Sequence, residues 1–398
     1  MTTTQQPPPV RSLAPLYLAG FTTAFGAHGV GSVLGAEIDD IGLSLLGLGI
    51  VLALYDVAEV ILKPLFGALS DRIGAKPVIV GGLVGFVVAS LLAIIYPTVV
   101  VLAIARLGQG AAASAFSPAS SAAVARIAGK QRLGRYFGRY GAWKSLGYVA
   151  GPLIGIVLVQ TLDIRALYIA LGFLAAAAAV WVAVAMPALP VQPRPRYTVV
   201  DLVRQTADRS FLIPTMLLAT TTAVLGVAIG FLPLLANRLD LPPIVGAVAI
   251  AVLALVSTLV QPVTGRLRDT GRISTRAGSS NGLAIAAAAL VLLAAAPNVV
   301  TLFFAALAFG VMIGLVTPLA FAHLAAATPE ERMGRTMGNA ELGREAGDAG
   351  GPLLVGAVAA AWTLPAALGI LAAGTAAASV VSWTTLRRRR PAADEPLQ

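Results

Sequence analysis

Long apolar stretches alternate with short polar breaks along almost the whole chain. Twelve stretches are long enough to cross a bilayer as α-helices, which takes about 20 mainly apolar residues each. They cover residues 13–36, 41–66, 77–96, 98–122, 138–160, 166–187, 210–236, 244–264, 278–296, 299–325, 338–361 and 364–386. The pattern predicts an all-α membrane protein with 12 transmembrane helices.

The widest break divides this series of helices in two. Residues 188–209 read ALPVQPRPRYTVVDLVRQTADR and are rich in proline and charge, which is typical of a linker. We expect an N-terminal six-helix half over residues 1–187, a cytoplasmic central linker over 188–209, and a C-terminal six-helix half with a basic tail over 210–398. The first apolar stretch is too long for a signal-peptide core, so it is interpreted as an uncleaved helix.

The two halves are related in sequence. A shift of 200 residues aligns seven identical residues within the 21 positions 132–152. The identical partners in the second half are Arg332, Gly334, Arg335, Gly338, Gly347, Gly351 and Pro352. An even number of helices per half makes the repeat parallel, which is an arrangement found in transporters. We therefore expect two pseudo-symmetric six-helix bundles.

Composition and charge agree with a membrane protein. The chain is 58% hydrophobic and 12% charged, whereas soluble domains carry roughly 25% charged residues. With the N-terminus inside, 22 of the 28 Lys and Arg residues fall in cytoplasmic segments, and only Arg165 and Arg238 fall outside. This bias predicts two cytoplasmic termini and explains the net charge of +10 without a nucleic-acid partner. Without cysteine and with two histidines, the chain is expected to hold no metal and no cofactor.

Glycines with a fixed spacing occur in the fifth predicted helix. Small residues four apart let another backbone approach closely, and proline permits a kink. The members of this pattern are Gly138, Gly147, Gly151, Pro152 and Gly155. The spacing resembles the fifth-helix antiporter motif of the major facilitator superfamily, although Ile156 replaces its final glycine. In that family the motif is typical of exporters that exchange substrate for protons.

Two further segments resemble motifs of the same family. GALSDRIGAK resembles the signature loop that latches the two halves at the inner face, with Ala75 in place of a usual basic residue. Its matching residues are Gly67, Leu69, Asp71, Arg72, Gly74 and Lys76, and a shorter copy, GRLRDTGR, keeps Gly265, Leu267 and Asp269. Asp71 is expected to accept hydrogen bonds from a neighbouring helix N-terminus. RLGQGAAA, which begins at Arg106, resembles the fourth-helix motif of proton-coupled members.

Five acidic and four basic residues fall within the predicted spans, where charge is costly and usually functional. An incompletely paired buried carboxylate binds a proton more readily than an exposed one. The proton-coupling candidates are Asp56 and Asp348, then Glu59, Glu341 and Glu345, with Arg106 tuning one of them and His28 as a relay. The alternative is permanent ion pairing, for example between Glu59 and Lys63 one turn apart, or an interfacial position for Glu341.

Aromatic and basic side chains are the candidates for a substrate cavity. Tyr140, Lys144 and Tyr148 share one face of the fifth helix, and such rings can stack on a cationic or aromatic substrate. The candidates are Tyr55, Tyr140, Lys144, Tyr148 and Arg344, with Trp143 as a further ring. Plain packing is the alternative for any one of them.

Together the helices and the resemblance imply a proton-coupled exporter of small amphipathic drugs or metabolites, of the multidrug efflux type. It is expected to work by alternating access as a monomer, among lipid, in a bacterial plasma membrane. We expect no enzyme activity, because the sequence offers no nucleophile–base pair. The excess of acid favours cationic substrates, while Lys144 and Arg344 leave anions open. The alternatives are an uptake symporter for a sugar or organic acid and, more remotely, an intramembrane enzyme or receptor.

Overall fold

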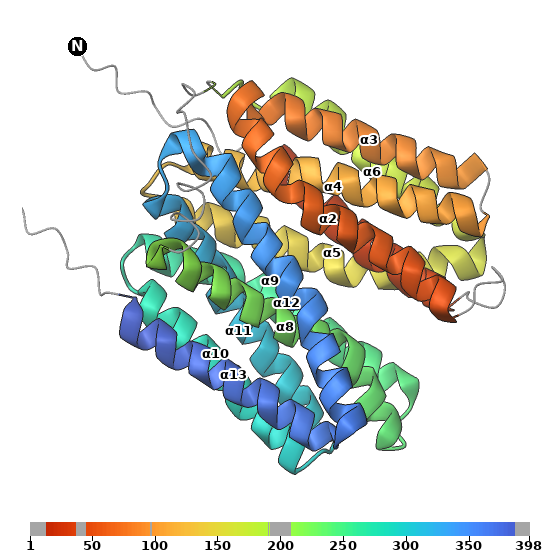
Figure 1. Ribbon diagram of the computed structural model, residues 1–398, viewed down its shortest axis with the longest axis vertical. Helices are drawn as coiled ribbons and strands as arrows, with labels where there is room; N and C mark the ends of the chain where they lie inside the picture. Colours follow the sequence, from red (N-terminus) through yellow and green to blue (C-terminus); the bar gives the residue numbers. More distant parts are fainter. Residues whose placement is uncertain (1–12, 37–44, 96–97, 190, 192–207, 387–398) are drawn as a thin grey trace, which may run out of the picture.

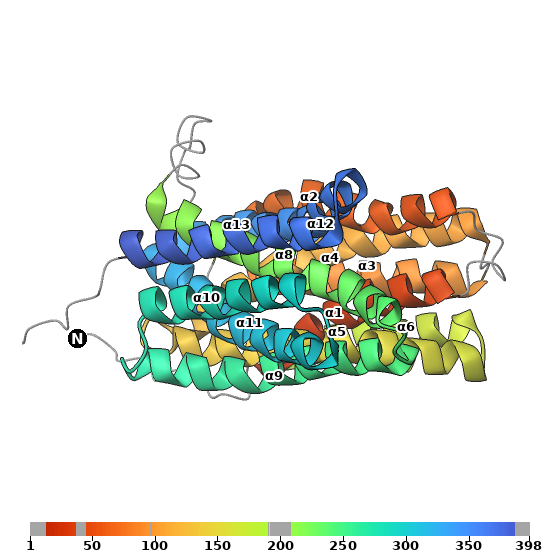
Figure 2. The same cartoon turned by 90° about the horizontal axis from the view of Figure 1, so that it is seen from below.

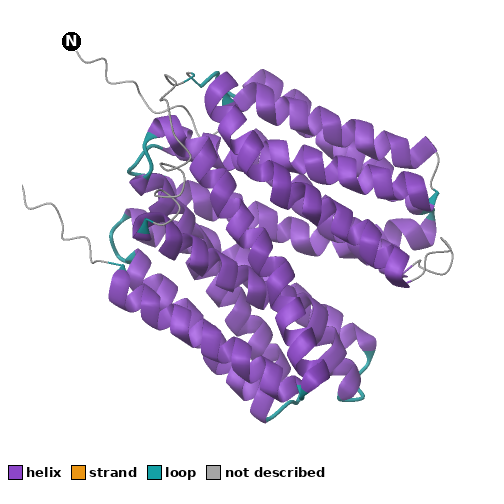
Figure 3. Ribbon diagram, viewed as in Figure 1, coloured by secondary structure: helices purple, strands orange, loops and turns teal. Residues whose placement is uncertain are grey.

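The computed structural model describes residues 13–36, 45–95, 98–189, 191 and 208–386. Within this part of the chain all regular structure is helical (Figure 3). The first six helices are α1 (Ala14–Ala36), α2 (Leu45–Ile73), α3 (Ala75–Ile95), α4 (Val99–Ala128), α5 (Leu133–Thr161) and α6 (Ile164–Ala185). The others are α8 (Arg209–Arg238), α9 (Pro243–Asp269), α10 (Thr275–Ala295), α11 (Val299–Ala327), the 3₁₀ segment η2 (Glu330–Arg332), α12 (Met333–Ala361) and α13 (Leu364–Thr385). These twelve α-helices confirm the predicted ones.

Nine of the described helices are apolar and long enough to cross a membrane. The other three, α1, α2 and α12, contribute polar or charged side chains to the site described below. The predicted linker at 188–209 lies almost entirely outside the described residues, and the boundaries of the two halves stay a prediction.

Polar caps and glycine turns set helix ends that hydrophobicity alone placed only roughly. The Asp163 side chain accepts from the Ala166 N–H at the start of α6, and Asn298 forms a capping box with Thr301 at the start of α11. Gly74 has φ +96°, which lets α2 and α3 follow one another with only this residue between them.

The helices form two bundles with the same internal packing (Figure 1). In the first, α1 packs on α5, α2 and α3 pack on α4, and α3 packs on α6. In the second, α8 packs on α12, α9 and α10 pack on α11, and α10 packs on α13. Figure 2, turned by 90°, shows the helices of both bundles running along one common direction. The predicted pseudo-symmetry is therefore present in the packing.

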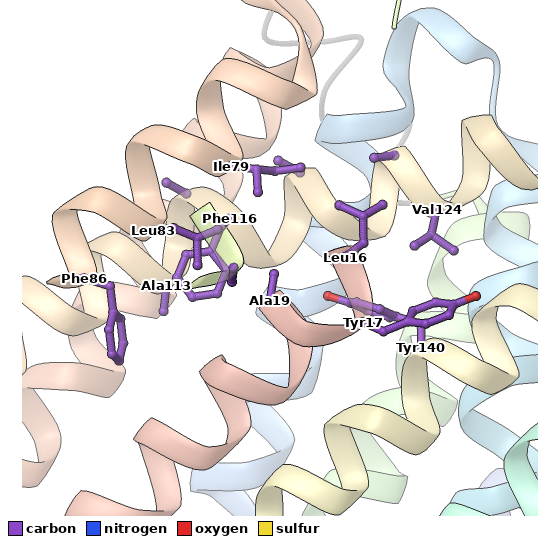
Figure 4. Packing of buried hydrophobic residues seen from close by; sticks show 14 of the residues in the cluster. Leu16, Tyr17, Ala19, Ile79, Leu83, Phe86, Ala113, Phe116, Val124 and Tyr140 are labelled. Carbon is purple, nitrogen blue, oxygen red and sulfur yellow. The ribbon is translucent and has the colours of Figure 1, made fainter. Parts of the chain in front are cut away.

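Each bundle has an apolar core built from close helix contacts. In the first, Leu83 and Phe86 of α3 lie beside Ala113 and Phe116 of α4 (Figure 4), and the two phenylalanine rings meet edge-on with centroids 6.1 Å apart. Buried alanines and glycines let the helix backbones come near one another. Each bundle is therefore packed around a core of its own.

Smaller contacts join α4 with α12 and α5 with α11, and the two main helix pairs between the bundles are α2 with α12 and α5 with α9. We call them the α2–α12 seam and the α5–α9 seam. In Figure 1, α2 and α12 converge where α12 begins and diverge toward the other end of the molecule. We call the end where α12 begins the basic end, because Arg332 and Arg335 lie there. The seams position the candidate site between the bundles.

Candidate functional site

A carboxylate caps a helix across the α2–α12 seam at the basic end. The Gly334 N–H donates to Asp71 Oδ1 at 2.8 Å, and the Arg335 N–H donates to Asp71 Oδ2 at 2.9 Å. The first N–H groups of a helix lack partners within the helix and carry its positive dipole end, so an aspartate stabilises them. Arg126 of α4 pairs with Asp71 at 2.6 Å and donates to the Glu330 carbonyl. The hydrogen bonds expected of Asp71 are confirmed.

The α5–α9 seam has the same device. The Gly134 N–H donates to Asp269 Oδ1 at 2.8 Å, and the Arg135 N–H donates to Asp269 Oδ2 at 2.7 Å. Arg268, on the same helix as Asp269, supplies its ion pair at 3.3 Å. We call these two arrangements the Asp71 latch and the Asp269 latch. The segment GRLRDTGR, the shorter copy of the signature loop, therefore caps a helix across its seam as GALSDRIGAK does.

The other residues of the signature loop stay at the basic end of α2 and α3. Arg72 is exposed, whereas the Lys76 ammonium donates to the Met186 carbonyl at 2.8 Å. Gly67 faces the backbone of Gly334, and an added Cβ would lie 3.2 Å from Gly338 Cα. The close approach of α2 and α12 therefore depends on glycine on both sides.

The motif glycines of α5 and α12 also mark backbone contacts. An added Cβ at Gly147 or Gly151 would lie 2.6 Å from a carbonyl oxygen of α1, that of Phe21 or Phe25. Gly138 faces the backbone of Gln261 in α9. The second-half copies repeat this, with Gly338 against α2 and Gly347 and Gly351 against α8. Gly155 lies against Val33 and Gly29 of α1, and Pro152 and Pro352 lie inside their helices. The expected close approach of helix backbones is confirmed.

Two adjoining pockets lie between the bundles. We call the first the acidic pocket because Asp56, Glu59, Glu345 and Asp348 line it. We call the second the aromatic pocket because Phe137, Tyr140, Tyr148 and Phe321 line it. Residues shared by both pockets are Lys144, Tyr148, Thr222, Leu225 and Arg344. Helices of both bundles thus contribute to one central site.

Lys63 of α2 is the centre of a buried charge cluster in the acidic pocket. Its ammonium lies 2.9 Å from Glu59 Oε2 and 2.5 Å from Glu345 Oε1. The second bond crosses from α2 to α12 and joins the bundles. The alternative of an ion pair between Glu59 and Lys63 is therefore observed. The sequence showed their shared helix face, but gave no sign of the partner 282 residues away.

Glu341 organises a second cluster at the aromatic pocket. Its Oε2 lies 3.1 Å from Arg344 Nη1 and 3.6 Å from Lys144 Nζ, and the Ser121 hydroxyl donates to its Oε1. Arg344 also donates to the Tyr148 hydroxyl at 3.0 Å. Glu341 is fully buried among the helices, and its depth in the membrane stays a prediction. The expectation of a pair with Arg344 is confirmed.

Asp56 and Asp348 face the acidic pocket from α2 and α12. Among the described residues, neither carboxylate lies within ion-pair distance of a basic side chain. His28 lines the same pocket from α1, with its ring centroid 4.6 Å from that of Tyr148. The two aspartates are therefore the carboxylates of the site that are left open to a ligand or a proton.

Arg106 does not form the ion pair that its expected tuning role suggests. Its guanidinium lies 4.3 Å from the centroid of the Tyr55 ring, and its Nε and Nη1 atoms have no hydrogen-bond partner within the described part of the chain. Tyr55 lines the acidic pocket, so Arg106 lies behind that ring rather than in the site. The positive charge is stabilised by the face of the ring.

Three of the predicted tyrosines line the pockets, and Trp143 does not. Tyr55 lines the acidic pocket, Tyr140 the aromatic pocket and Tyr148 both. Trp143 contacts Phe21 edge-on and is 43% exposed, and it lines neither pocket. Residue 143 is one position before Lys144, so the helix turns its side chain away from the site.

Several lining residues were not predicted as site residues. Ser145, Ser257 and Gln261 form a hydrogen-bonded group beside the aromatic pocket, and Thr222 donates to the Arg344 carbonyl. Small polar residues within apolar helices do not stand out in the sequence as site residues. Their positions in the internal repeat could have indicated that they lie in a seam. Within the described residues, no group of three or more His, Asp or Glu side chains is arranged to hold a metal ion.

Comparison with known proteins gives a consistent family. The family model described as Major Facilitator Superfamily matches residues 16–338. The quinolone resistance protein NorA of Staphylococcus aureus is 29% identical over 40% of this chain and 42% of its own length. The class B tetracycline resistance protein of Escherichia coli is 36% identical over 27% of this chain and 26% of its own length. The chain therefore aligns with less than half of either relative.

The fold matches solved structures over almost its whole length. The E. coli fucose:proton symporter FucP superposes with a TM-score of 0.77 at 14% identity and covers 94% of this chain and 98% of its own. A second FucP structure, described as being in the outward conformation, gives the same score and covers 93% and 97%. At this identity the likeness supports the fold alone.

Proposed function

We propose, from the premise that the chain belongs to the major facilitator superfamily, that this membrane transporter is a proton-coupled exporter of small amphipathic compounds. The observation that carries the proposal is the pair of unpaired carboxylates, Asp56 and Asp348, which face one pocket from the two bundles. A site that binds either a proton or a cationic substrate, but not both, exchanges one for the other.

The charge balance of the cavity supports a cationic substrate. Five carboxylates line the two pockets, against three basic side chains, Lys63, Lys144 and Arg344. These three bases already pair with Glu59, Glu345 and Glu341. The rings of Phe137, Tyr140 and Phe321 supply apolar and cation–π contacts for the rest of the ligand.

Alternating access is supported by the geometry of the seams. The latches hold the bundles together at the basic end, and α2 and α12 diverge toward the other end of the molecule (Figure 1). By the positive-inside rule the basic end is cytoplasmic, so this arrangement faces outward, in a plasma membrane. Substrate is released and protons enter in this state, and the reverse rocking of the bundles gives access to the cytoplasm. We propose a monomer as the working unit, because both bundles that line the pockets belong to the same chain.

The experiment uses inside-out vesicles from cells that lack their own efflux pumps. A proton gradient is imposed and followed with a pH-sensitive dye while lipophilic cations, neutral drugs and organic anions are added in turn. Export in exchange for protons predicts that cations dissipate the gradient. Asp56→Asn and Asp348→Asn should each abolish the effect.

Asp163→Asn is the matched control, because asparagine caps α6 as well as aspartate does and lies away from the pockets. A gradient that no compound dissipates, together with proton-driven uptake of a sugar or organic acid in right-side-out vesicles, would establish the symporter alternative.

A further inference from the structure

The two seams carry the same layout of three side chains beside the central site. In the α5–α9 seam, Gln261 Nε2 donates to Ser145 Oγ at 2.8 Å and to Ser257 Oγ at 3.0 Å. In the α2–α12 seam, the Lys63 ammonium donates to Glu345 at 2.5 Å and to Glu59 at 2.9 Å. We call these the neutral triad and the charged triad. In both, a donor on one helix bonds its own i−4 neighbour and a residue across the seam.

The repeat places the two triads at equivalent positions. A shift of 200 residues relates Ser145 to Glu345, as it relates the glycines of α5 to those of α12. A shift of 198 relates Glu59 and Lys63 to Ser257 and Gln261, and the same shift relates Asp71 to Asp269. One framework therefore holds a triad that cannot titrate and a triad that can.

The charged triad has two carboxylates for one ammonium. Two of its side chains are nearly inaccessible, with 2% of Lys63 and 5% of Glu59 exposed, and among the described residues Glu59 Oε1 has no hydrogen-bond partner. Glu345 is the accessible member, at 18% exposed, and it lines the acidic pocket. A proton that arrives through the pocket therefore meets Glu345 first.

Protonation of Glu345 leaves the other two residues of the charged triad paired with each other. The carboxylate accepts one proton on an oxygen, and its ion pair with Lys63 across the seam is lost. Lys63 keeps Glu59 as a partner one turn away, so the buried ammonium is not left without a counter-charge. The neutral triad has no equivalent step.

Other charges surround Glu345. Around it lie Asp56, Glu59 and Lys63 of α2, Lys144 and Tyr148 of α5, and His28 of α1, together with Glu341, Arg344 and Asp348 of its own helix. Arg106 of α4 lies behind the Tyr55 ring. Of these, Lys63 is the group bonded to Glu345 from the other bundle. Both seams also end in an aspartate latch, whereas the triads give the two seams different chemistry beside the pockets.

We propose that Glu345 makes closure of the basic end proton-sensitive, by breaking the bond between α12 and Lys63 of α2 when it is neutralised. The inference rests on the proposed proton coupling and assigns the proton-sensitive step to Glu345 of the charged triad. The ionised form stabilises the closed seam, so the stabilisation is present at alkaline pH and is lost as the pH falls through the titration of Glu345. The neutral triad holds its seam with a strength that pH does not change.

The test measures a distance across the basic end as a function of pH. The natural chain has no cysteine, so Ile73→Cys and Glu331→Cys introduce two exposed labelling sites, one on α2 and one on η2 next to α12. Spin labels at these sites, in the full chain in lipid nanodiscs, report the opening of the seam. We expect the distance distribution to shift to longer values from alkaline to acidic pH.

Three variants locate the source of the shift. Copying the neutral triad into the α2–α12 seam by Glu59→Ser, Lys63→Gln and Glu345→Ser should abolish the pH response. Glu345→Gln alone, which keeps the shape of the side chain, should give the long distances at every pH. Gln261→Ala weakens the neutral triad instead, and should keep the pH response.

The outcomes separate this inference from the proposed function. A pH response that persists in Glu345→Gln, or that is lost in Gln261→Ala, overturns the inference. A wild-type distance that does not change with pH also overturns it, whether or not the gradient assay finds proton exchange. A shift that Glu345→Gln removes supports the inference, even if the gradient assay finds no exported compound.

Discussion

Gly351 and Gly350 are neighbours in α12 but have different surroundings. A Cβ at position 351 would lie 2.6 Å from Ala223 Cα, whereas a Cβ at 350 would meet nothing within 4 Å. We expect Gly351→Ala to lower the free energy of unfolding in detergent by about 1–3 kcal/mol, because backbone cannot rotate away from the clash. Gly350→Ala should be neutral or raise it by up to about 1 kcal/mol. Equal effects at both positions would contradict the packing described here.

At this scale the sequence predicted residue types better than residue partners. The spacing of Gly138, Gly147 and Gly151 indicated close backbones, since only glycine allows the approach observed. It could not show that Lys63 reaches Glu345, because the rotation of α2 against α12 depends on packing along the whole seam. The Tyr55 ring that holds Arg106 was missed for the same reason.

At the scale of elements, we expect the Asp71 latch and the Asp269 latch to hold the basic end closed together. Asp71→Ala and Asp269→Ala each remove two hydrogen bonds that a helix N-terminus donates to a carboxylate, and such bonds contribute about 1.5–3 kcal/mol each. In the double variant, the basic end should open more often. A cysteine at Met337, which is fully buried in α12, should then react about tenfold faster or more with a thiol reagent, since about 1.4 kcal/mol is a factor of ten.

A cysteine at Ala305 is the control for that reaction, because it is fully buried within the core of the second bundle. Its rate should stay unchanged in the double variant. Equal acceleration at both sites would indicate general unfolding and not the opening of a latch.

The helices themselves were predictable because their apolar length is dictated by the bilayer. The ends of the helices were less predictable, because some helices extend beyond their apolar stretches. Helix α2 continues to Ile73 and α12 begins at Met333, both within polar sequence.

At the scale of the whole molecule, the charge bias predicts how the chain sits in the membrane. A cysteine at the exposed Pro297, between α10 and α11, should react with an impermeant thiol reagent in intact cells. A cysteine at the exposed Gln131, between α4 and α5, should react only after the membrane is permeabilised. The reverse result would invert the proposed direction of transport.

The whole-molecule arrangement followed from the repeat in the sequence. Seven identities at a shift of 200 predicted paired bundles, and the contacts of Gly134 with Gly265 and of Gly334 with Gly67 carry that symmetry into the seams. The repeat did not predict where symmetry is broken. The charged triad of the α2–α12 seam corresponds to the neutral triad of the α5–α9 seam, and the glycine spacing gave no sign of this difference.

The most direct test of the account measures protons released when substrate binds. Purified protein in weakly buffered detergent solution is mixed with a cation identified by the gradient assay, and a pH indicator follows the solution. If substrate and proton compete for Asp56 and Asp348, binding to the wild type should release protons, and the double Asp→Asn variant should release none. Binding without proton release, or release that persists in the variant, would contradict the claim that these cavity carboxylates exchange a proton for the substrate.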